Sequence, residues 1–224
     1  MPAPSLRAMP KRTHAAVTPD VMALRNGLKR LFDMPCANGK RVGGCKYGVY
    51  LFYDYDQEPI YVGQTYESLR VRIGRHLTNQ RTDAVAMNVL DPFEVAEIEM
   101  WPFWELEGQL NAKQTLDRAE FTVYQYALAR SQFHVVLNEG EILPQAVLPL
   151  PPSVRGTILS VEERRVRNHP DLRLARRAQT IANLARVISE RQVTQGIRRT
   201  LLAQAQRLEW LARTRLRELE EKEN

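Results

Sequence analysis

The chain has 224 residues, of which 44% are hydrophobic and 26% charged, and its formal net charge is +6. This length fits one domain with an appendage, and the composition is typical of a globular protein, which argues against wholesale disorder. No stretch approaches the ~18 uncharged apolar residues of a membrane span, and residues 1–12 are Pro-rich and basic without the apolar core of a secretory signal. We therefore expect a cytoplasmic protein with no membrane partner.

The two cysteines, Cys36 and Cys45, form no CxxC pair. This spacing argues against both a disulfide scaffold and a structural zinc site.

Charge is distributed unevenly along the chain. Residues 1–45 contain eight Lys/Arg and two Asp/Glu, residues 46–152 contain eight and fifteen, and residues 153–224 contain sixteen and nine. An acidic centre thus lies between two basic flanks. The flanks could hold a polyanion while carboxylates of the centre bind a metal ion or do chemistry. Arg-rich helices are also often merely solvated, so charge alone leaves nucleic-acid binding open.

The first half of the chain predicts an α+β arrangement. Residues 1–17 are expected to form a disordered arm, and Thr18 with Pro19 resembles the start of a helix that ends at Met34-Pro35. A Gly-rich loop over 38–44 follows. The aromatic and β-branched residues 47–53 predict a strand, and with a polar turn over 54–59 and a short strand over 60–62 they predict an antiparallel hairpin. Further elements are expected as a helix over 67–78, a strand over 93–100, a helix over 111–129 and a short apolar run over 133–137.

The last third of the chain predicts helices only. Residues 141–153 form a Pro-containing linker, and residues 154–224 form a basic helical region broken at Pro170 and Gly196. Two apolar stripes are expected on these helices: Leu174, Ala178, Ile181, Ala185 and Ile188, and then Leu201, Leu208 and Leu211. Strict heptads fail, which argues against a long coiled coil. The stripes would pack either on a second copy of the chain or back on the centre. The fold class is therefore α+β, with a small antiparallel sheet of about three strands flanked by helices.

The central region carries an ordered set of polar side chains. Gly48-Val49-Tyr50 and Tyr61-Val62-Gly63 lie on the predicted hairpin, Arg72 and His76 share one face of the next helix, and Glu120 and Asn138 follow. This order resembles the GIY-YIG nuclease family over residues 46–140. The interval from Glu120 to Asn138 is long for that family. The resemblance divides the chain into a basic arm and helix (1–45), a nuclease domain (46–140), the linker (141–153) and a basic region for DNA binding or dimerisation (154–224).

The resemblance implies catalytic roles for Tyr50, Tyr61, Arg72, His76, Glu120 and Asn138. Phosphodiester hydrolysis needs an in-line water, a group that takes its proton and positive charge on the phosphate. Tyr50 would contact the water and His76 would accept the phenolic proton. Arg72 offers a planar fork of donors to phosphate oxygens, with Arg75 as its nearest rival.

Glu120 is the expected ligand of Mg²⁺ (or Mn²⁺), because magnesium keeps much of its hydration and needs few carboxylates. Asp117, one turn earlier, is the rival ligand. Four further residues are expected to bind nucleic acid: Gln64, Thr65, Arg70 and Arg75. His14, His134 and His169 belong to no constellation and are expected to be structural or exposed.

The function implied by the resemblance is a magnesium-dependent endonuclease that cuts double-stranded DNA, leaving 5′-phosphate and 3′-hydroxyl ends. A short chain of this family favours a restriction-system enzyme that acts as a homodimer on palindromes. The alternatives are a homing or other phage-related GIY-YIG endonuclease, a non-catalytic nucleic-acid-binding protein on the same scaffold, or Arg-rich helices that pack on a partner protein.

Overall fold

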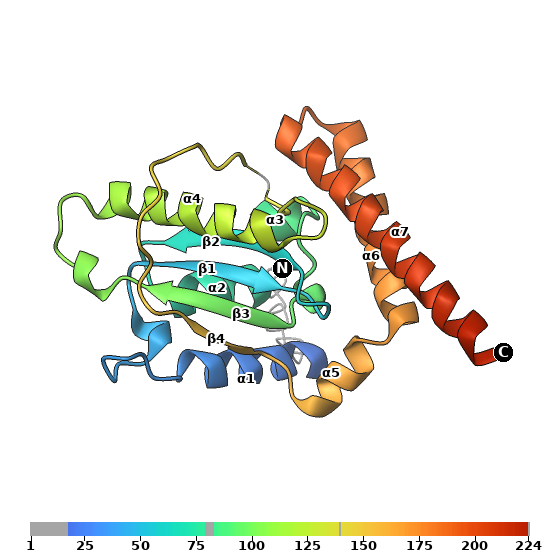
Figure 1. Cartoon of the computed structure of the whole chain (residues 1–224), viewed down its shortest axis with the longest axis horizontal. Coiled ribbons are helices and arrows are strands. Elements are labelled where there is room, and N and C mark those ends of the chain that lie inside the picture. The colour runs from blue at the N-terminus through green and yellow to red at the C-terminus, as the bar shows by residue number, and fades with distance from the viewer. Residues whose placement is uncertain (1–17, 79–82, 139, 224) are drawn as a thin grey trace, which may run out of the picture.

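The computed structural model describes residues 18–78, 83–138 and 140–223. Its centre is an antiparallel sheet with the strand order β2-β1-β3-β4, built from β1 (Gly48–Tyr53), β2 (Pro59–Thr65), β3 (Glu97–Pro102) and β4 (Val154–Thr157) (Figure 1). The α+β class and the β1–β2 hairpin are confirmed. β2 is longer than the predicted strand 60–62. The expectation of about three strands misses β4, which pairs with β3 immediately after the Pro-containing segment.

The helices are α1 (Pro19–Phe32), α2 (Leu69–Thr78), α3 (Asp83–Ala86), α4 (Ala112–Arg130), α5 (Val161–Arg167), α6 (Pro170–Glu190) and α7 (Gln195–Glu223). A helix begins at Pro170, as predicted, whereas the second break spans residues 191–194 and leaves Gly196 inside the first turn of α7. The predicted arm over 1–17, with His14, lies outside the described residues. In the described part of the chain, none of the helices is both long enough and apolar enough to span a bilayer.

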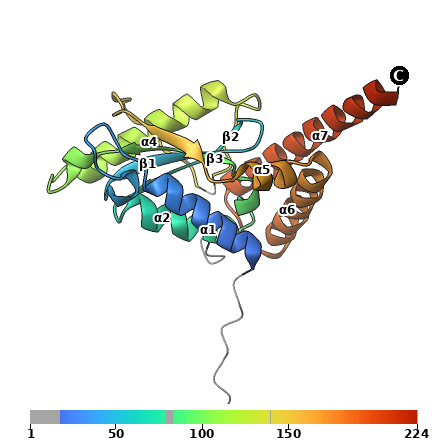
Figure 2. The same ribbon diagram turned by 90° about the horizontal axis from the view of Figure 1, so that it is seen from below.

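The sheet lies between two helical layers, with α4 on one face and α1 and α2 on the other (Figures 1 and 2). β1 is buried along its whole length because both faces of this central strand are covered. Its residues alternate: Val49, Leu51 and Tyr53 pack in the cluster that includes Leu116 of α4. Tyr50 and Phe52 pack in the cluster of α1 and α2. β2 forms one edge of the sheet, and that edge positions the site described below.

The helices α6 and α7 pack against each other, and their buried faces differ from the predicted stripes. α6 buries Arg173, Arg177, Leu184 and Val187, and α7 buries Ile197, Thr200, Ala203, Gln204, Arg207 and Leu211. Most of the predicted stripe is only partly buried, and Ala178 and Ala185 are exposed. The apolar residues are therefore displaced from the buried face by arginines.

These arginines bind the turn of the β1–β2 hairpin. Arg207 and Arg177 donate to one oxygen of Asp54 at 2.5 and 2.9 Å, and Arg173 forms a two-pronged pair with Asp56. The side chains of all three arginines are 2–3% exposed. The other oxygen of Asp54 accepts the backbone N–H groups of residues 56 and 58 and closes the turn. The basic C-terminal helices thus neutralise part of the acidic centre.

The turn is also fixed to the end of α4. Glu58 accepts from the Ser131 hydroxyl and from the backbone N–H of Gln132, and Arg207 lies 3.9 Å from its carboxylate. Glu94 completes the cluster through Arg176 and Arg177. We refer to Arg173, Arg176, Arg177 and Arg207 with Asp54, Asp56, Glu58 and Glu94 as the arginine cluster.

Candidate active site

Tyr50 and Gly63 face each other across the β1–β2 hairpin. The Tyr50 side chain is fully buried, and its hydroxyl would lie 2.4 Å from a Cβ atom placed on Gly63. A glycine is therefore required at this position, because any side chain would displace the phenol. This contact gives a physical reason for the glycine that ends the Tyr61-Val62-Gly63 motif.

His76 lies next to both tyrosines of the hairpin. Its ring centroid is 6.0 Å from that of Tyr50 and 5.4 Å from that of Tyr61. Burial, together with the positive charges of the nearby Arg72 and Arg75, lowers the pKa of His76 to about 4. Neither ring nitrogen has a hydrogen-bond partner among the described residues. The imidazole is therefore neutral at pH 7 and able to accept a proton.

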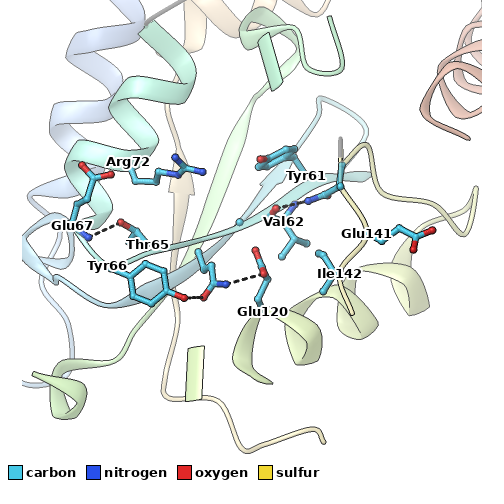
Figure 3. Close-up of a pocket in the computed structure, with 13 residues that line it drawn as sticks. Tyr61, Val62, Thr65, Tyr66, Glu67, Arg72, Glu120, Glu141 and Ile142 are labelled. Atoms are coloured by element: carbon cyan, nitrogen blue, oxygen red, sulfur yellow. Dashed lines mark hydrogen bonds between the residues drawn. The ribbon is translucent and has the colours of Figure 1, made fainter. Parts of the chain in front are cut away.

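Arg72 reaches from α2 into a cavity of about 470 Å³ beside β2. Within the described part of the chain this arginine has no carboxylate within ion-pair distance, and its buried Nε makes no hydrogen bond. Figure 3 shows Arg72, Tyr61 and Glu120 directed from α2, β2 and α4 toward the same space. A guanidinium without an internal counter-charge in such a cavity is suited to bind an anion.

Two carboxylates of α4 approach the cavity from the other side. Asp117 and Glu120 are three residues apart on the helix, and both accept from the side-chain amide of Gln64, at 2.9 and 3.1 Å. Glu120 lines the cavity, whereas Asp117 lines a separate hollow with Leu110 and Gln114. Gln64 therefore connects the β2 strand to the carboxylates.

The donor set fits a hard, well-hydrated cation. The described residues contain no group of three or more acidic, His or Cys side chains that could enclose a metal ion. One carboxylate, Glu120, with Asp117 as its neighbour, suits Mg²⁺ because this ion retains several waters and accepts further oxygens from a phosphate.

Asn138 and Thr65 have structural partners in the site. The Asn138 amide donates to the carbonyl of Val62 at 2.8 Å and accepts the Val62 backbone N–H at 3.3 Å, so that it pairs with the edge of β2. The Thr65 hydroxyl accepts the backbone N–H of Glu67 in the turn that leads into α2. Both residues line the cavity, and their hydrogen bonds fix the backbone around it.

The two remaining arginines predicted to bind nucleic acid have acidic partners. Arg70 points away from the cavity, donates to Asp33 at 2.7 Å and lies over the ring of Phe32. Arg75 pairs with Glu67 at the rim. Of the two candidates for the phosphate contact, Arg72 is thus the one inside the cavity.

Two histidines that the sequence assigns no role stand apart from the cavity. His169 is exposed near Asp171 at the start of α6, and His134 lies after α4 with a positive φ of 51°. Neither lines the cavity.

Sequence reasoning misses several residues of the cavity wall: Tyr66, Glu67, Gly140, Glu141 and Ile142. The first two directly follow Gln64 and Thr65, which the sequence analysis expects to bind nucleic acid, and this adjacency is the signal that could have identified them. Tyr66 donates to the carboxylate of Asp117 at 3.3 Å.

Arg72, Tyr61 and Glu120 thus line one cavity, and the buried Tyr50 and the neutral His76 lie beside Tyr61. Residues 46–107 match the family model of the GIY-YIG catalytic domain, which confirms the resemblance to the GIY-YIG nuclease family over this stretch. The matched stretch includes Tyr50, Tyr61, Arg72 and His76 and ends before α4. The searches of curated proteins and of solved structures give no match.

Proposed function

We propose that the chain is a Mg²⁺-dependent DNA endonuclease that leaves 5′-phosphate and 3′-hydroxyl ends. The observation that carries this proposal is the position of Arg72, which among the described residues has no carboxylate partner, in a cavity shared with Tyr61 and Glu120. The match to the GIY-YIG catalytic domain supports nuclease activity in general. The specific chemistry is inferred from the side chains of the site.

The residues divide the work of hydrolysis among them. Arg72 holds the oxygens of the scissile phosphate, and Tyr61 donates a hydrogen bond beside it. The Tyr50 oxygen takes a proton from the attacking water while its own phenolic proton passes to neutral His76, directly or through one water, and solvent water protonates the 3′-oxygen as it leaves. A free phenol has a pKa of ~10, so about 4 kcal/mol is needed to ionise it at pH 7 without such help. Glu120 would hold the metal ion, which when bound would supply positive charge for the phosphate and the 3′-oxygen leaving group.

The unpaired surface cations indicate where DNA is held. Arg25, Lys29 and Arg30 on the outer side of α1 are exposed and, among the described residues, pair with no carboxylate. Arg191 and Arg198, at the junction of α6 and α7, are likewise exposed and unpaired there. Arginines of the arginine cluster are committed to the protein itself. We therefore assign the DNA contacts of the two basic flanks to these free cations.

Within this proposal we favour a restriction-type enzyme that works as a homodimer, with double-stranded DNA as its partner. Leucines on the outer side of α6 and α7 are exposed: Leu172, Leu202, Leu216 and Leu219. They offer an apolar face for a second copy, which a palindromic site would require. Sedimentation of the full chain with and without DNA tests this step. A monomer under both conditions would favour a homing or nicking enzyme instead.

The direct test is nicking of supercoiled plasmid with Mg²⁺ and with EDTA, followed by end-labelling of the products. We expect cleavage with Mg²⁺ only. Glu120→Gln should abolish cleavage and leave DNA binding nearly intact, and Asp117→Asn should retain most of the activity. Near-normal cutting by Glu120→Gln would move the metal to Asp117 or elsewhere. DNA binding without cleavage by the native chain would identify a non-catalytic binding protein.

A further inference from the structure

A second, smaller hollow adjoins the catalytic cavity. It has a volume of about 160 Å³ and shares Asn138, Gly140, Glu141 and Ile142 with the 470 Å³ cavity. The two hollows therefore meet along this segment. The far end of the second hollow is formed by the first turns of α7, through Gly196, Arg199 and Thr200.

Two of the residues shared by the hollows, Asn138 and Gly140, differ in their surroundings. The Thr200 hydroxyl donates to the backbone carbonyl of Asn138 at 3.3 Å, and the Asn138 side chain is bound to β2. A Cβ atom on Gly140 would meet nothing within 4 Å. Gly140 therefore adds no side chain to the space between the two hollows.

Arg199 is the cation of the second hollow, and its acidic partner there is Glu141 at 2.6 Å. Both side chains are 58% exposed. A solvent-exposed pair of this kind contributes only about 0–1 kcal/mol, so a phosphate can displace the carboxylate. The buried arginines of the arginine cluster have no such freedom.

We propose that Arg199 forms a second phosphate subsite, which binds the DNA backbone next to the phosphate held by Arg72. Glu141 holds the guanidinium until a phosphate replaces it. This inference rests on the proposed function for the identity of the polyanion. It adds a contact from α7, a helix outside the stretch that matches the catalytic domain.

The test is binding of mixed-sequence duplex DNA to the full chain in EDTA, measured by fluorescence anisotropy from ~50 to ~200 mM salt. Each lost phosphate contact makes the slope of log K against log salt about 0.9 shallower. We expect this change for Arg199→Ala and not for Arg199→Lys. Arg213→Ala is the matched control, because Arg213 is an exposed arginine of α7 paired with Glu209. Glu141→Gln should bind more tightly than the native chain.

An unchanged slope for Arg199→Ala, or a change equal to that of Arg213→Ala, would overturn the inference. Because the measurement is made without metal, it is independent of cleavage. A chain that nicks plasmid normally but shows no effect of Arg199→Ala would refute the second subsite and leave the nuclease intact. A chain that binds DNA through Arg199 but never cleaves it would refute the nuclease and leave the subsite.

Discussion

The two ends of the β1–β2 hairpin carry opposite kinds of charged cluster. At the turn, each buried arginine has a carboxylate within hydrogen-bond distance, as in the 2.5 Å contacts of Arg207 with Asp54 and of Arg173 with Asp56. At the other end, Arg72 has no carboxylate partner in the described part of the chain. In the first cluster every arginine is neutralised by a carboxylate of the protein, and the cluster joins the C-terminal helices to the sheet. The second leaves the guanidinium of Arg72 facing a cavity, as a site for an anionic substrate requires.

Removing the C-terminal helices is the change with the largest expected effect. A chain reduced to residues 46–152 would lose β4 and leave the buried carboxylates of the turn without their arginines. Each broken buried pair costs about 3–5 kcal/mol, against a total stability of about 5–15 kcal/mol for a domain. We expect no cooperative unfolding transition in circular dichroism. A chain ending at residue 216 should unfold like the full chain, and native-like unfolding of the 46–152 chain would contradict the structural role of the cluster.

Substitutions of the proton-transfer pair should have the largest effect on activity in a folded protein. Tyr50→Phe and His76→Ala should each reduce the cleavage rate about 10²–10⁴-fold. Their effects should be strongly non-additive, because both serve one proton transfer. Tyr126→Phe removes a hydroxyl from a tyrosine packed on Trp101, outside the cavity, and should cut normally. Fully additive losses in single-turnover assays would mean that the two residues act separately.

Alanine substitutions at two glycines should have different effects on cleavage, because only one of the glycines contacts Tyr50. Gly63→Ala places a methyl group 2.4 Å from the Tyr50 hydroxyl and should cost about 1–3 kcal/mol of stability together with most of the activity. Gly74 lies in α2 with open space around its Cα. Gly74→Ala should raise the free energy of unfolding by about 0.5–1 kcal/mol and leave cleavage unchanged. Equal activity in both variants, measured in the nicking assay, would refute the proposed contact.

Because His76 is buried in its neutral state, we expect the free energy of unfolding to depend on pH. Burial lowers its pKa to about 4, below the ~6.5 of an unfolded histidine. The unfolded chain therefore binds a proton first as pH falls, and folding stability decreases between pH 6.5 and 4, by about 2 kcal/mol at pH 5. Urea unfolding at pH 8 and pH 5 measures this loss. His76→Leu should show a smaller loss by about that amount, and an identical loss would mean that His76 titrates normally.

Much of the candidate active site could be predicted from the sequence, because the strands and the helix that carry its residues have local sequence patterns. Aromatic and β-branched residues around a polar turn predict β1 and β2, and the four-residue spacing of Arg72 and His76 places them on one face of a helix. β4 has only four residues after a Pro-rich segment and gives no comparable signal. The wall formed by Glu141 and Ile142 also escapes prediction, because it depends on how the chain returns past β2.

The buried faces of α6 and α7 could not be predicted for a different reason. Helical periodicity assigns the buried face to apolar residues, whereas Arg207 is buried because it meets Asp54, 153 residues earlier in the chain. Pairing at such a separation leaves no trace in a local pattern. The basic composition of residues 153–224 indicates DNA binding, yet several of these arginines bind the protein's own carboxylates.

The most direct test of the contrast between the two clusters is a paired comparison of Arg72→Ala and Arg207→Met, with plasmid nicking and urea unfolding measured on each. Arg72→Ala should lose at least about 10²-fold in cleavage while its free energy of unfolding stays within about 0.5 kcal/mol of the native value. Arg207→Met should lose about 3 kcal/mol of stability. Native-level cleavage by Arg72→Ala, or native stability of Arg207→Met, would contradict the assignment of one cluster to catalysis and the other to the fold.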